Sequence, residues 1–308
     1  MTAPAITPGA ASPLKGFAGV ARANFLVLPL TLAAVGGAAA AFNGRLDLAA
    51  VLLATLGLVA VHAAVNAFNE VSDIRTGIDL VTQRTPFSGG SGTLPAGIIP
   101  TRVAERFAWL AFAVGAAIGV WAIARVGWPL VPVIAAGAIA VLFYTPWLGR
   151  TGVGEIFAGL GLGALPIIGV AMVSGSPVND TVLVASLPAF FMTFDLLLLN
   201  EFPDERADRA GGRRHLVILL GRRAAARIYV LAAVLVPVTI VAGVLLGALP
   251  GWALLGLLPS LLLVKPLGWA LGSAEGDPPL PALGANVVWN LATNTLLAVG
   301  LGLASALG

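Results

Sequence analysis

Long apolar runs separated by short charged loops dominate this sequence of 308 residues. A helix of about 20 apolar residues crosses the roughly 30 Å hydrocarbon core of a bilayer. A backbone in lipid must satisfy its own hydrogen bonds, so runs of this length are expected to be helices. The sequence therefore predicts an all-α polytopic membrane protein with nine transmembrane helices, at residues 24–43, 49–69, 104–124, 128–146, 154–174, 180–200, 223–246, 250–271 and 284–306.

The composition excludes several classes of protein. Hydrophobic residues make up 58% of the chain and charged residues only 10%, whereas about a quarter of a soluble domain is charged. The chain has no cysteine and two histidines, which excludes disulfides and thiolate metal sites and argues against a histidine-rich metal centre. Its basic residues fall in short loops between apolar spans, so they indicate membrane topology and no nucleic-acid partner.

The first residues differ in composition from the rest. Residues 1–15 are rich in Ala, Pro, Thr and Ser and lack the pattern of a signal peptide. We expect them to form a flexible N-terminal tail, and residues 16–308 to form a single transmembrane domain.

Positive charges fall almost entirely on one side of the predicted topology. With nine spans, the N-terminal segment and every second loop share one membrane face. That face carries fifteen of the seventeen Lys and Arg residues, and the other face has only Arg45 and Arg125. Basic loops stay in the cytoplasm, so we expect a cytoplasmic N-terminus, an outside C-terminus and, in a bacterium, a place in the inner membrane.

Two acidic clusters, each led by asparagine, lie on this same face. The first is residues 69–73 (Asn-Glu-Val-Ser-Asp), followed by Asp79, and the second is residues 200–208 (Asn-Glu-Phe-Pro-Asp-Glu-Arg-Ala-Asp). The leading Asn and the first Asp recur at a displacement of 131 positions (69 to 200 and 73 to 204). Carboxylates at the ends of membrane helices are costly to desolvate, so the repetition favours one shared ion site over solvated loop charges. Pro203 is expected to stop or kink the sixth span.

The residue types in both clusters favour a hard cation. Carboxylate and amide oxygens without thiolates are typical ligands of Mg²⁺, which is usually shared with substrate phosphates. Helical spacing places His62, Asn66, Asn69 and Asp73 on one face of the second span, which indicates a polar cavity. The two clusters therefore predict a clamp for a Mg²⁺-bound diphosphate.

In these motifs the chain resembles the UbiA superfamily of intramembrane prenyltransferases, and the resemblance covers essentially its whole length. It implies nine helices around a central cavity open at the cytoplasmic side, with aspartate-rich motifs after the second and sixth. The first cluster resembles the N-D-x-x-D motif of the family, with Glu70 in place of the aspartate at the second position of the motif. Residues 73–79, 144–146, 152–155 and 204–214 are similar to the branch that prenylates 1,4-dihydroxy-2-naphthoate for menaquinone.

A loop rich in Gly and Ser follows the first cluster at residues 84–92 (Arg-Thr-Pro-Phe-Ser-Gly-Gly-Ser-Gly). Such a loop lets backbone N–H groups approach an anion, and Arg84 offers a bidentate partner for phosphate. We favour this role over that of a plain connection. The expected diphosphate-binding residues are Arg84, Ser88, Ser91, Arg213 and Asn66. Arg213, with Arg214 and His215, could instead serve only to set the topology.

Three further polar features lie inside the predicted spans. Asn286, Asn290 and Asn294 repeat every four residues, and we interpret them as an inward stripe for hydrogen bonding between helices. Asp195 is either a functional carboxylate or a hydrogen-bonded structural one. His62 could accept a proton near an aromatic ring, but a lone helical histidine is more often structural, so we leave it outside the catalytic core.

The resemblance implies Mg²⁺-dependent transfer of a polyprenyl group from a polyprenyl diphosphate to an aromatic acceptor, with 1,4-dihydroxy-2-naphthoate or a similar quinone precursor as the expected acceptor. Asp73, Asp204, Asn69 and Asn200 would be catalytic. Two Mg²⁺ ions would be held by Asn69, Glu70, Asp73, Asp79, Asn200, Asp204 and Asp208. The bilayer is a further partner, and the oligomeric state stays open.

Three alternatives stay open at this point. One is transfer to another aromatic acceptor, and another is a UbiA-type terpene cyclase that uses no acceptor. The third, from a different class, is an ion-coupled transporter. Both acidic clusters lie at one membrane face, whereas transporter sites usually lie near the midplane, which disfavours that reading.

Overall fold

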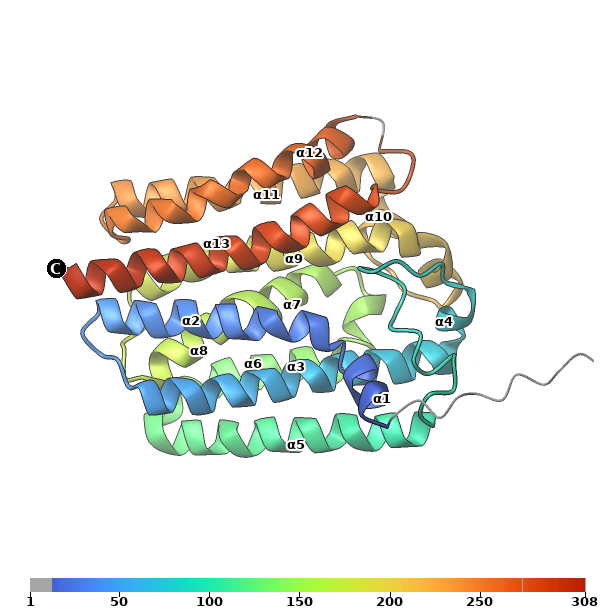
Figure 1. The fold of residues 1–308 in the computed structure, drawn as a ribbon, viewed down its shortest axis with the longest axis horizontal. Coiled ribbons are helices and arrows are strands. Elements are labelled where there is room, and N and C mark those ends of the chain that lie inside the picture. The colour runs from blue at the N-terminus through green and yellow to red at the C-terminus, as the bar shows by residue number, and fades with distance from the viewer. Residues whose placement is uncertain (1–12, 273, 308) are drawn as a thin grey trace, which may run out of the picture.

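The computed structural model describes residues 13–272 and 274–307, and every regular element in these two segments is helical. The long helices lie side by side with roughly parallel axes (Figure 1). Large apolar side chains such as Leu56, Val120 and Leu261 are exposed on the outside of the bundle, as expected for a surface that faces lipid. The prediction of an all-α membrane protein is confirmed.

Eight helical stretches are long and apolar enough to span a bilayer, and each matches a predicted span. They are Ala23–Phe42, Leu48–Thr76, Thr101–Val126, Gly154–Val173, Asp180–Ala210, Arg222–Leu245, Gly251–Leu271 and Leu280–Leu307. The remaining predicted span, 128–146, corresponds to the shorter apolar helix Trp128–Phe143. The count of nine crossings therefore stays a prediction.

The elements follow one another along the chain in a simple order. The long ones are α2 (Val27–Phe42), α3 (Leu48–Thr76), α5 (Thr101–Val126), α6 (Val131–Phe143), α7 (Gly154–Gly159) with η4 (Leu160–Ala164) and α8 (Leu165–Val173), α9 (Asp180–Ala210), α11 (Arg222–Leu245), η5 (Gly251–Leu263) with α12 (Val264–Leu271), and α13 (Leu280–Leu307). The short ones are α1 (Pro13–Val20), α4 (Ile78–Val81) and α10 (Leu216–Leu220).

Two helices run past their predicted ends and carry the acidic clusters with them. α3 continues to Thr76, where Gly77 ends it with a left-handed φ of 80°, a conformation that glycine adopts without strain. α9 continues to Ala210 through both Pro188 and Pro203. Of the two outcomes expected at Pro203, the stop is therefore wrong, and the kink stays a prediction. A proline removes one backbone hydrogen bond, and α9, at 31 residues, continues on either side of it.

The core forms where the helices approach most closely. One buried cluster joins Leu32 and Val35 of α2 to Ile167 of α8, Val182 of α9 and Leu297 of α13. Small residues allow this approach. A Cβ placed on Gly300 of α13 would lie 2.2 Å from the carbonyl oxygen of Trp252 in η5, so only glycine fits between these two backbones.

The two ends of the bundle differ in their chemistry. We call the end that bears α4 and α10 the charged end, and the C-terminus lies at the opposite end (Figure 1). At the opposite end, Asp47 caps α3 by accepting from the Ala50 N–H (3.0 Å) and pairs with Arg125 (2.5 Å). The hydrogen bond from Ala50 and the Arg125 charge lower the pKa of Asp47. Most of the expected tail, residues 1–12, lies outside the described residues, and residues 13–15 begin α1.

Candidate active site

The two acidic clusters occupy equivalent places at the charged end. The first lies in the last two turns of α3 and the second in the last three turns of α9. Asp73 and Asp208 are both buried. Buried carboxylates require charged or hydrogen-bonding partners, and each cluster finds some of its partners in the segment that follows the other cluster.

Reciprocal hydrogen bonds join the clusters. Arg213, which follows α9, donates to Asn69 Oδ1 (2.8 Å) and to Asp73 of α3, and its Nη1 lies 3.4 Å from Asp208 Oδ1. In the other direction, the Gly89 N–H after α3 donates to Asp204 Oδ2 of α9 (3.1 Å). Each loop thus contacts the opposite cluster, so the two motifs belong to one site.

Arg213 is the central cation of this arrangement. It lies outside the membrane-spanning helices, and its pKa is raised above its ordinary value by the negative charges of Asp208 and Asp73, which outweigh the effect of burial. It therefore does more than set topology, since it bridges both clusters.

Glu70 has a different environment from the other acidic residues. It is fully buried, and its Oε1 accepts from Arg22 Nε (2.9 Å) and from the Ser91 N–H (2.7 Å). Its Oε2 accepts from the Ser91 hydroxyl (2.7 Å). The residue predicted to bind metal and the serine predicted to bind phosphate are therefore hydrogen-bonded to each other. They fix the loop of residues 84–92 to α3.

The rest of this loop is also held internally. The Ser88 hydroxyl pairs with the Thr85 hydroxyl (2.9 Å), and Arg84 donates to the Asp79 carbonyl (2.7 Å). Gly90 has a φ of 74°, and a Cβ there would lie 2.6 Å from Asp79 Oδ1. The loop backbone therefore passes directly over the Asp79 carboxylate, which requires glycine.

Three buried carboxylate oxygens of the two clusters have no hydrogen-bond partner among the described residues: Asp79 Oδ2, Glu201 Oε2 and Asp204 Oδ1. Asp79 lies outside the spanning helices, and burial together with the charges of Glu70 and Asp73 raises its pKa to about 7. Unpartnered hard oxygens are suitable ligands for Mg²⁺. Within residues 13–272 and 274–307, however, no three His, Asp or Glu side chains are grouped closely enough to hold a metal ion.

A cavity of about 170 Å³ adjoins both clusters. We call it the chamber. Its polar wall includes Asn69 and Asn200, the leading residues of the two motifs, and its aromatic wall includes Phe25, Phe157 and Tyr144. The other polar lining residues are Arg22, His62, Asn66, Thr193 and Arg213. The chamber is therefore polar at the clusters and aromatic elsewhere.

A second, almost entirely apolar cavity of about 290 Å³ lies next to the chamber. We call it the apolar cavity. The two share Val141, Gly161 and Leu162 as lining residues. The α7–η4–α8 segment is kinked at this junction, because Leu162 has non-helical backbone angles (φ −113°, ψ 15°) and η4 forms one wide turn. The freed Leu162 carbonyl accepts from the Thr193 hydroxyl (3.2 Å).

A family profile and known proteins match this fold and sequence. The profile of the UbiA prenyltransferase family matches residues 27–291. The chain belongs to the UbiA prenyltransferase family. It is also 24% identical over 273 residues to the 1,4-dihydroxy-2-naphthoate octaprenyltransferase of Bacillus subtilis strain 168, a match that covers 87% of this chain and 86% of that protein.

Solved structures of UbiA homologues share the fold. The apo homologue from Aeropyrum pernix K1 superposes with a TM-score of 0.68 at 20% identity, over 90% of this chain and 96% of that one. The homologue from Archaeoglobus fulgidus bound to DMAPP and Mg²⁺ gives a TM-score of 0.60 at 15% identity, over 92% and 99%. The family makes this chain a membrane-embedded prenyltransferase.

Behind Arg213 this UbiA chain has a further polar group, which adds to the site two residues that the sequence did not single out, Tyr144 and Glu155. His215 lies 3.8 Å from Glu201 through Nδ1 and 3.5 Å from Asp208 through Nε2. Glu155 accepts from the Leu216 N–H (2.6 Å). Tyr144, just past α6, lines a small cavity together with Glu201 and His215. Tyr144 and Glu155 fall in stretches that resemble the family, and this was their only signal in the sequence.

Arg22 is the other contributor that the sequence did not indicate. It lies between α1 and α2 with a left-handed backbone (φ 48°), lines the chamber and pairs with Glu70. A single arginine ahead of the first span gives no signal that separates it from an ordinary flanking charge.

The polar stripe of α13 faces inward, as predicted. Asn286, Asn290 and Asn294 are buried. Asn286 accepts from the Tyr229 hydroxyl (2.9 Å), and Asn294 donates to Asn290 (2.9 Å). Asp195 is buried, and its backbone carbonyl accepts from Asn286 (3.4 Å), but both of its carboxylate oxygens lack a hydrogen-bond partner among the described residues, so the alternative of a hydrogen-bonded structural carboxylate is not supported. These contacts join α9, α11 and α13, which favours the interpretation as hydrogen bonding between helices.

Proposed function

We propose that this chain transfers a polyprenyl group from a polyprenyl diphosphate to 1,4-dihydroxy-2-naphthoate or a closely similar aromatic acceptor. The observation that supports the proposal is that a charged site lies next to an apolar cavity. Two cross-bonded carboxylate clusters with unpartnered oxygens adjoin a chamber, and the chamber shares a wall with the apolar cavity. The similarity to the Bacillus subtilis octaprenyltransferase supports the choice of acceptor.

The charges at the site suit a diphosphate and a divalent cation together. Asp79 and Asp204 offer unpartnered buried oxygens, which fit a hard cation. When Mg²⁺ is bound, its positive charge neutralises the departing diphosphate, and Asp79 and Asp204, with Asp73, Asp208, Asn69 and Asn200, would hold it. The Archaeoglobus fulgidus homologue with DMAPP and Mg²⁺ supports this pairing. Arg22 and Arg213 line the chamber and supply further positive charge for the anion.

The two substrates would bind in different parts of the space formed by the chamber and the apolar cavity. The apolar cavity suits the prenyl tail, and the aromatic wall of the chamber suits a planar acceptor. In the reaction the allylic C–O bond breaks with its electrons going to the diphosphate. A ring carbon of the acceptor then bonds to the prenyl carbon, and with a naphthoate the carboxylate leaves as CO₂ and restores the aromatic ring. Apolar walls exclude water that would capture the prenyl cation.

We also propose that the charged end faces the cytoplasm. Fifteen of the seventeen basic residues fall on that side of the predicted topology, and such loops are retained in the cytoplasm. A cysteine-accessibility assay in intact cells tests this, because the chain has no cysteine of its own. Labelling of a cysteine at position 206 by an impermeant reagent in intact cells would contradict it.

The deciding experiment supplies the purified protein with a radiolabelled polyprenyl diphosphate, with and without Mg²⁺ and with and without 1,4-dihydroxy-2-naphthoate. Mass spectrometry should detect a prenylated product without the carboxylate only when both are present. Release of diphosphate with a cyclised hydrocarbon and no coupled product would favour a terpene cyclase. No release under any condition would contradict prenyl transfer by this site.

A second experiment tests the apolar cavity as the tail site. Gly137 lines this cavity, and a Cβ there would meet nothing within 4 Å. Gly137→Leu should leave the protein folded and shift the preference to shorter prenyl diphosphates by about tenfold, since each lost buried CH₂ contributes about 0.8 kcal/mol. Gly268→Leu in α12 is the matched control, because that glycine is equally open and lines no cavity described here. An unchanged chain-length preference in Gly137→Leu would place the tail elsewhere.

A further inference from the structure

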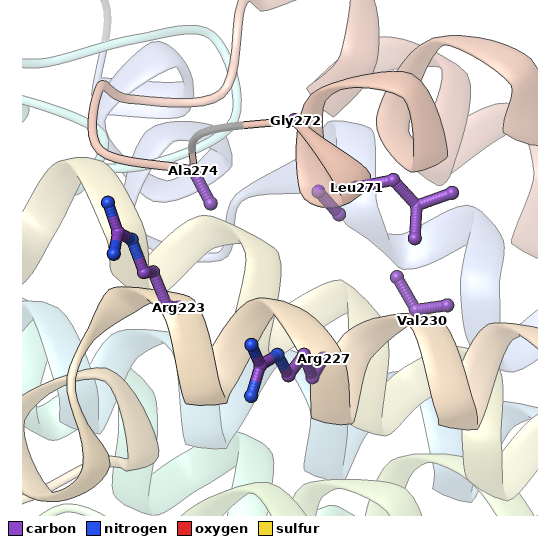
Figure 2. A pocket seen from close by; sticks show the side chains of 7 residues that line it. Arg223, Arg227, Val230, Leu271, Gly272 and Ala274 are labelled. Carbon is purple, nitrogen blue, oxygen red and sulfur yellow. The ribbon is translucent and has the colours of Figure 1, made fainter.

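A groove of about 380 Å³ lies between α11 and α12, near the charged end. Figure 2 shows Arg223 and Arg227 on α11, with Leu271 and the turn at Ala274 facing them across the groove. The two arginines are four residues apart, so they lie one above the other on the same helix face. The groove shares no lining residue with the chamber or the apolar cavity.

The charges of the groove are available to an anion. Arg227 is exposed and makes no hydrogen bond or ion pair with any residue that the structure describes. Among the described residues, Arg223 pairs only with Glu275, and both side chains are largely exposed, at 71% and 66%. An ion pair this exposed contributes little to stability, so a phosphate can replace Glu275 at little cost.

The neighbouring arginine has a different role. Arg222 donates to the Phe202 carbonyl (3.1 Å), Glu205 (2.8 Å) and Asp277 (2.7 Å). Arg222 therefore neutralises Glu205 and Asp277, and it holds the turn at Ala274, which borders the groove, by donating to the Ala274 carbonyl (3.4 Å). The net positive charge of the groove remains with Arg223 and Arg227.

The groove changes from charged to apolar along α11. Beyond Arg227 the same helix face continues with Val230, Val234 and Val238, and the last two are exposed. Across the groove from Val230, Leu271 of α12 is 71% exposed, and Val264, at the start of α12, is 73% exposed. A site with two arginines at the membrane surface and exposed apolar side chains toward the bilayer centre is complementary to a phospholipid along its length.

We propose that this groove binds an anionic phospholipid of the bilayer. Arg223 and Arg227 hold its phosphate, and an acyl chain lies along Val230 and Leu271. An anionic lipid is favoured over a zwitterionic one because the groove supplies two cations and only Glu275, already paired with Arg223, as a counter-charge. The proposal does not depend on prenyl transfer, since the groove is separate from the chamber.

The test is native mass spectrometry of the detergent-solubilised protein titrated with phosphatidylglycerol or phosphatidylcholine. The wild type should retain phosphatidylglycerol at least about tenfold more tightly, because both lipids carry the phosphate but phosphatidylcholine adds a choline cation, which Arg223 and Arg227 repel. The double variant Arg223→Gln/Arg227→Gln should lose this preference. A tenfold excess of inorganic phosphate should leave the bound lipid in place.

The matched control is Arg102→Gln/Arg106→Gln on α5. These two arginines are also exposed and four residues apart, and they line no cavity described here. The control removes the same charge and should keep the preference. Equal binding of the two lipids, an unaffected groove variant, or an equal loss in the control would overturn the proposal. Displacement of the lipid by inorganic phosphate would also overturn it, in favour of a site for free anions. Unchanged prenyl transfer by the groove variant in detergent shows that it is folded.

Discussion

The two acidic clusters share a sequence pattern, but their glutamates and aspartates differ in the hydrogen bonds that they accept. Glu70 and Glu201 each follow the leading asparagine, and the pattern makes them counterparts. Glu70 accepts three hydrogen bonds from Arg22 and Ser91. Glu201 has an Oε2 without a hydrogen-bond partner in the described chain, and its ion contact with His215 is long, at 3.8 Å.

The aspartates differ in the same way. Asp73 of the first cluster receives the guanidinium of Arg213, whereas Asp204 of the second receives one backbone N–H and keeps a bare oxygen. Protein cations therefore neutralise Glu70 and Asp73, whereas Glu201 and Asp204 keep unpartnered oxygens, although Glu205 and Asp208 of the second cluster pair with Arg222 and Arg213. The comparison indicates that Glu70 and Asp73 of α3 form a fixed wall, and that Asp204 of α9 and Asp79 after α3 keep oxygens available to a cation.

The strongest test of this difference is Asp204→Asn. The amide keeps an oxygen for the Gly89 N–H and removes the charge, so we expect turnover to fall by about a hundredfold or more, as when one ligand of a catalytic ion is lost. Steady-state kinetics at saturating Mg²⁺ measures it. Asp180→Asn, at the exposed opposite end of the same helix, should keep wild-type rates. Full activity in Asp204→Asn would contradict the difference between the two clusters, because the charge of Asp204 would then not be needed for turnover.

Arg213→Gln tests whether the first cluster depends on the second loop. It leaves Asp73 and Asp208 buried without their cation, and removal of one partner from a buried ion pair costs about 3–5 kcal/mol. We expect a clear fall in thermal stability in detergent, together with loss of activity. Arg214→Gln is the control, because the Arg214 side chain is exposed. An equal effect of the two substitutions would mean that stability depends on the positive charge of the loop after α9 and not on the ion pairs of Arg213 with Asp73 and Asp208.

The substitutions Glu70→Gln and Glu201→Gln test the difference between the two glutamates directly. Glu70→Gln weakens three hydrogen bonds and an ion pair in a fully buried position, so it should destabilise the protein by about 2 kcal/mol. Glu201→Gln replaces a carboxyl whose Oε2 has no hydrogen-bond partner among the described residues, so it should be neutral or mildly stabilising. The midpoints of thermal unfolding of the two variants, measured side by side, decide this. Equal losses would contradict the asymmetry.

The smallest expected effect is a pH dependence from Asp79. Its pKa of about 7 lies above the ordinary aspartate value of 3.8, so the folded state binds more protons than the unfolded state between these values. Stability should therefore fall as the pH rises from about 4 to 7 and level off above that range. Thermal unfolding with EDTA present measures this slope. Asp79→Asn should flatten it, and an unchanged slope would assign the effect to another group.

The sequence predicted the membrane class, the spans and the pairing of the clusters, because each depends on local composition and spacing. The roles inside the clusters depended on contacts between distant segments. Ser91 lies 21 residues from Glu70, and Arg22 lies 48 residues from it, so no local pattern could show that Glu70 is already satisfied. The predicted stop at Pro203 was wrong because the sequence does not show how the packing of α9 compensates for the one backbone hydrogen bond that a proline removes. The kink at Leu162 had no signal in an unbroken apolar run.

The bond between Arg213 and Asp73 spans 140 residues, and this has a consequence for biosynthesis. The ribosome completes α3 long before it adds Arg213, so Asp73 reaches the membrane surface without the cation that neutralises it in the finished protein. The nascent N-terminal half must hold that carboxylate in water until α9 and the segment after it have been inserted. The last steps of membrane insertion, rather than the first, therefore complete the site.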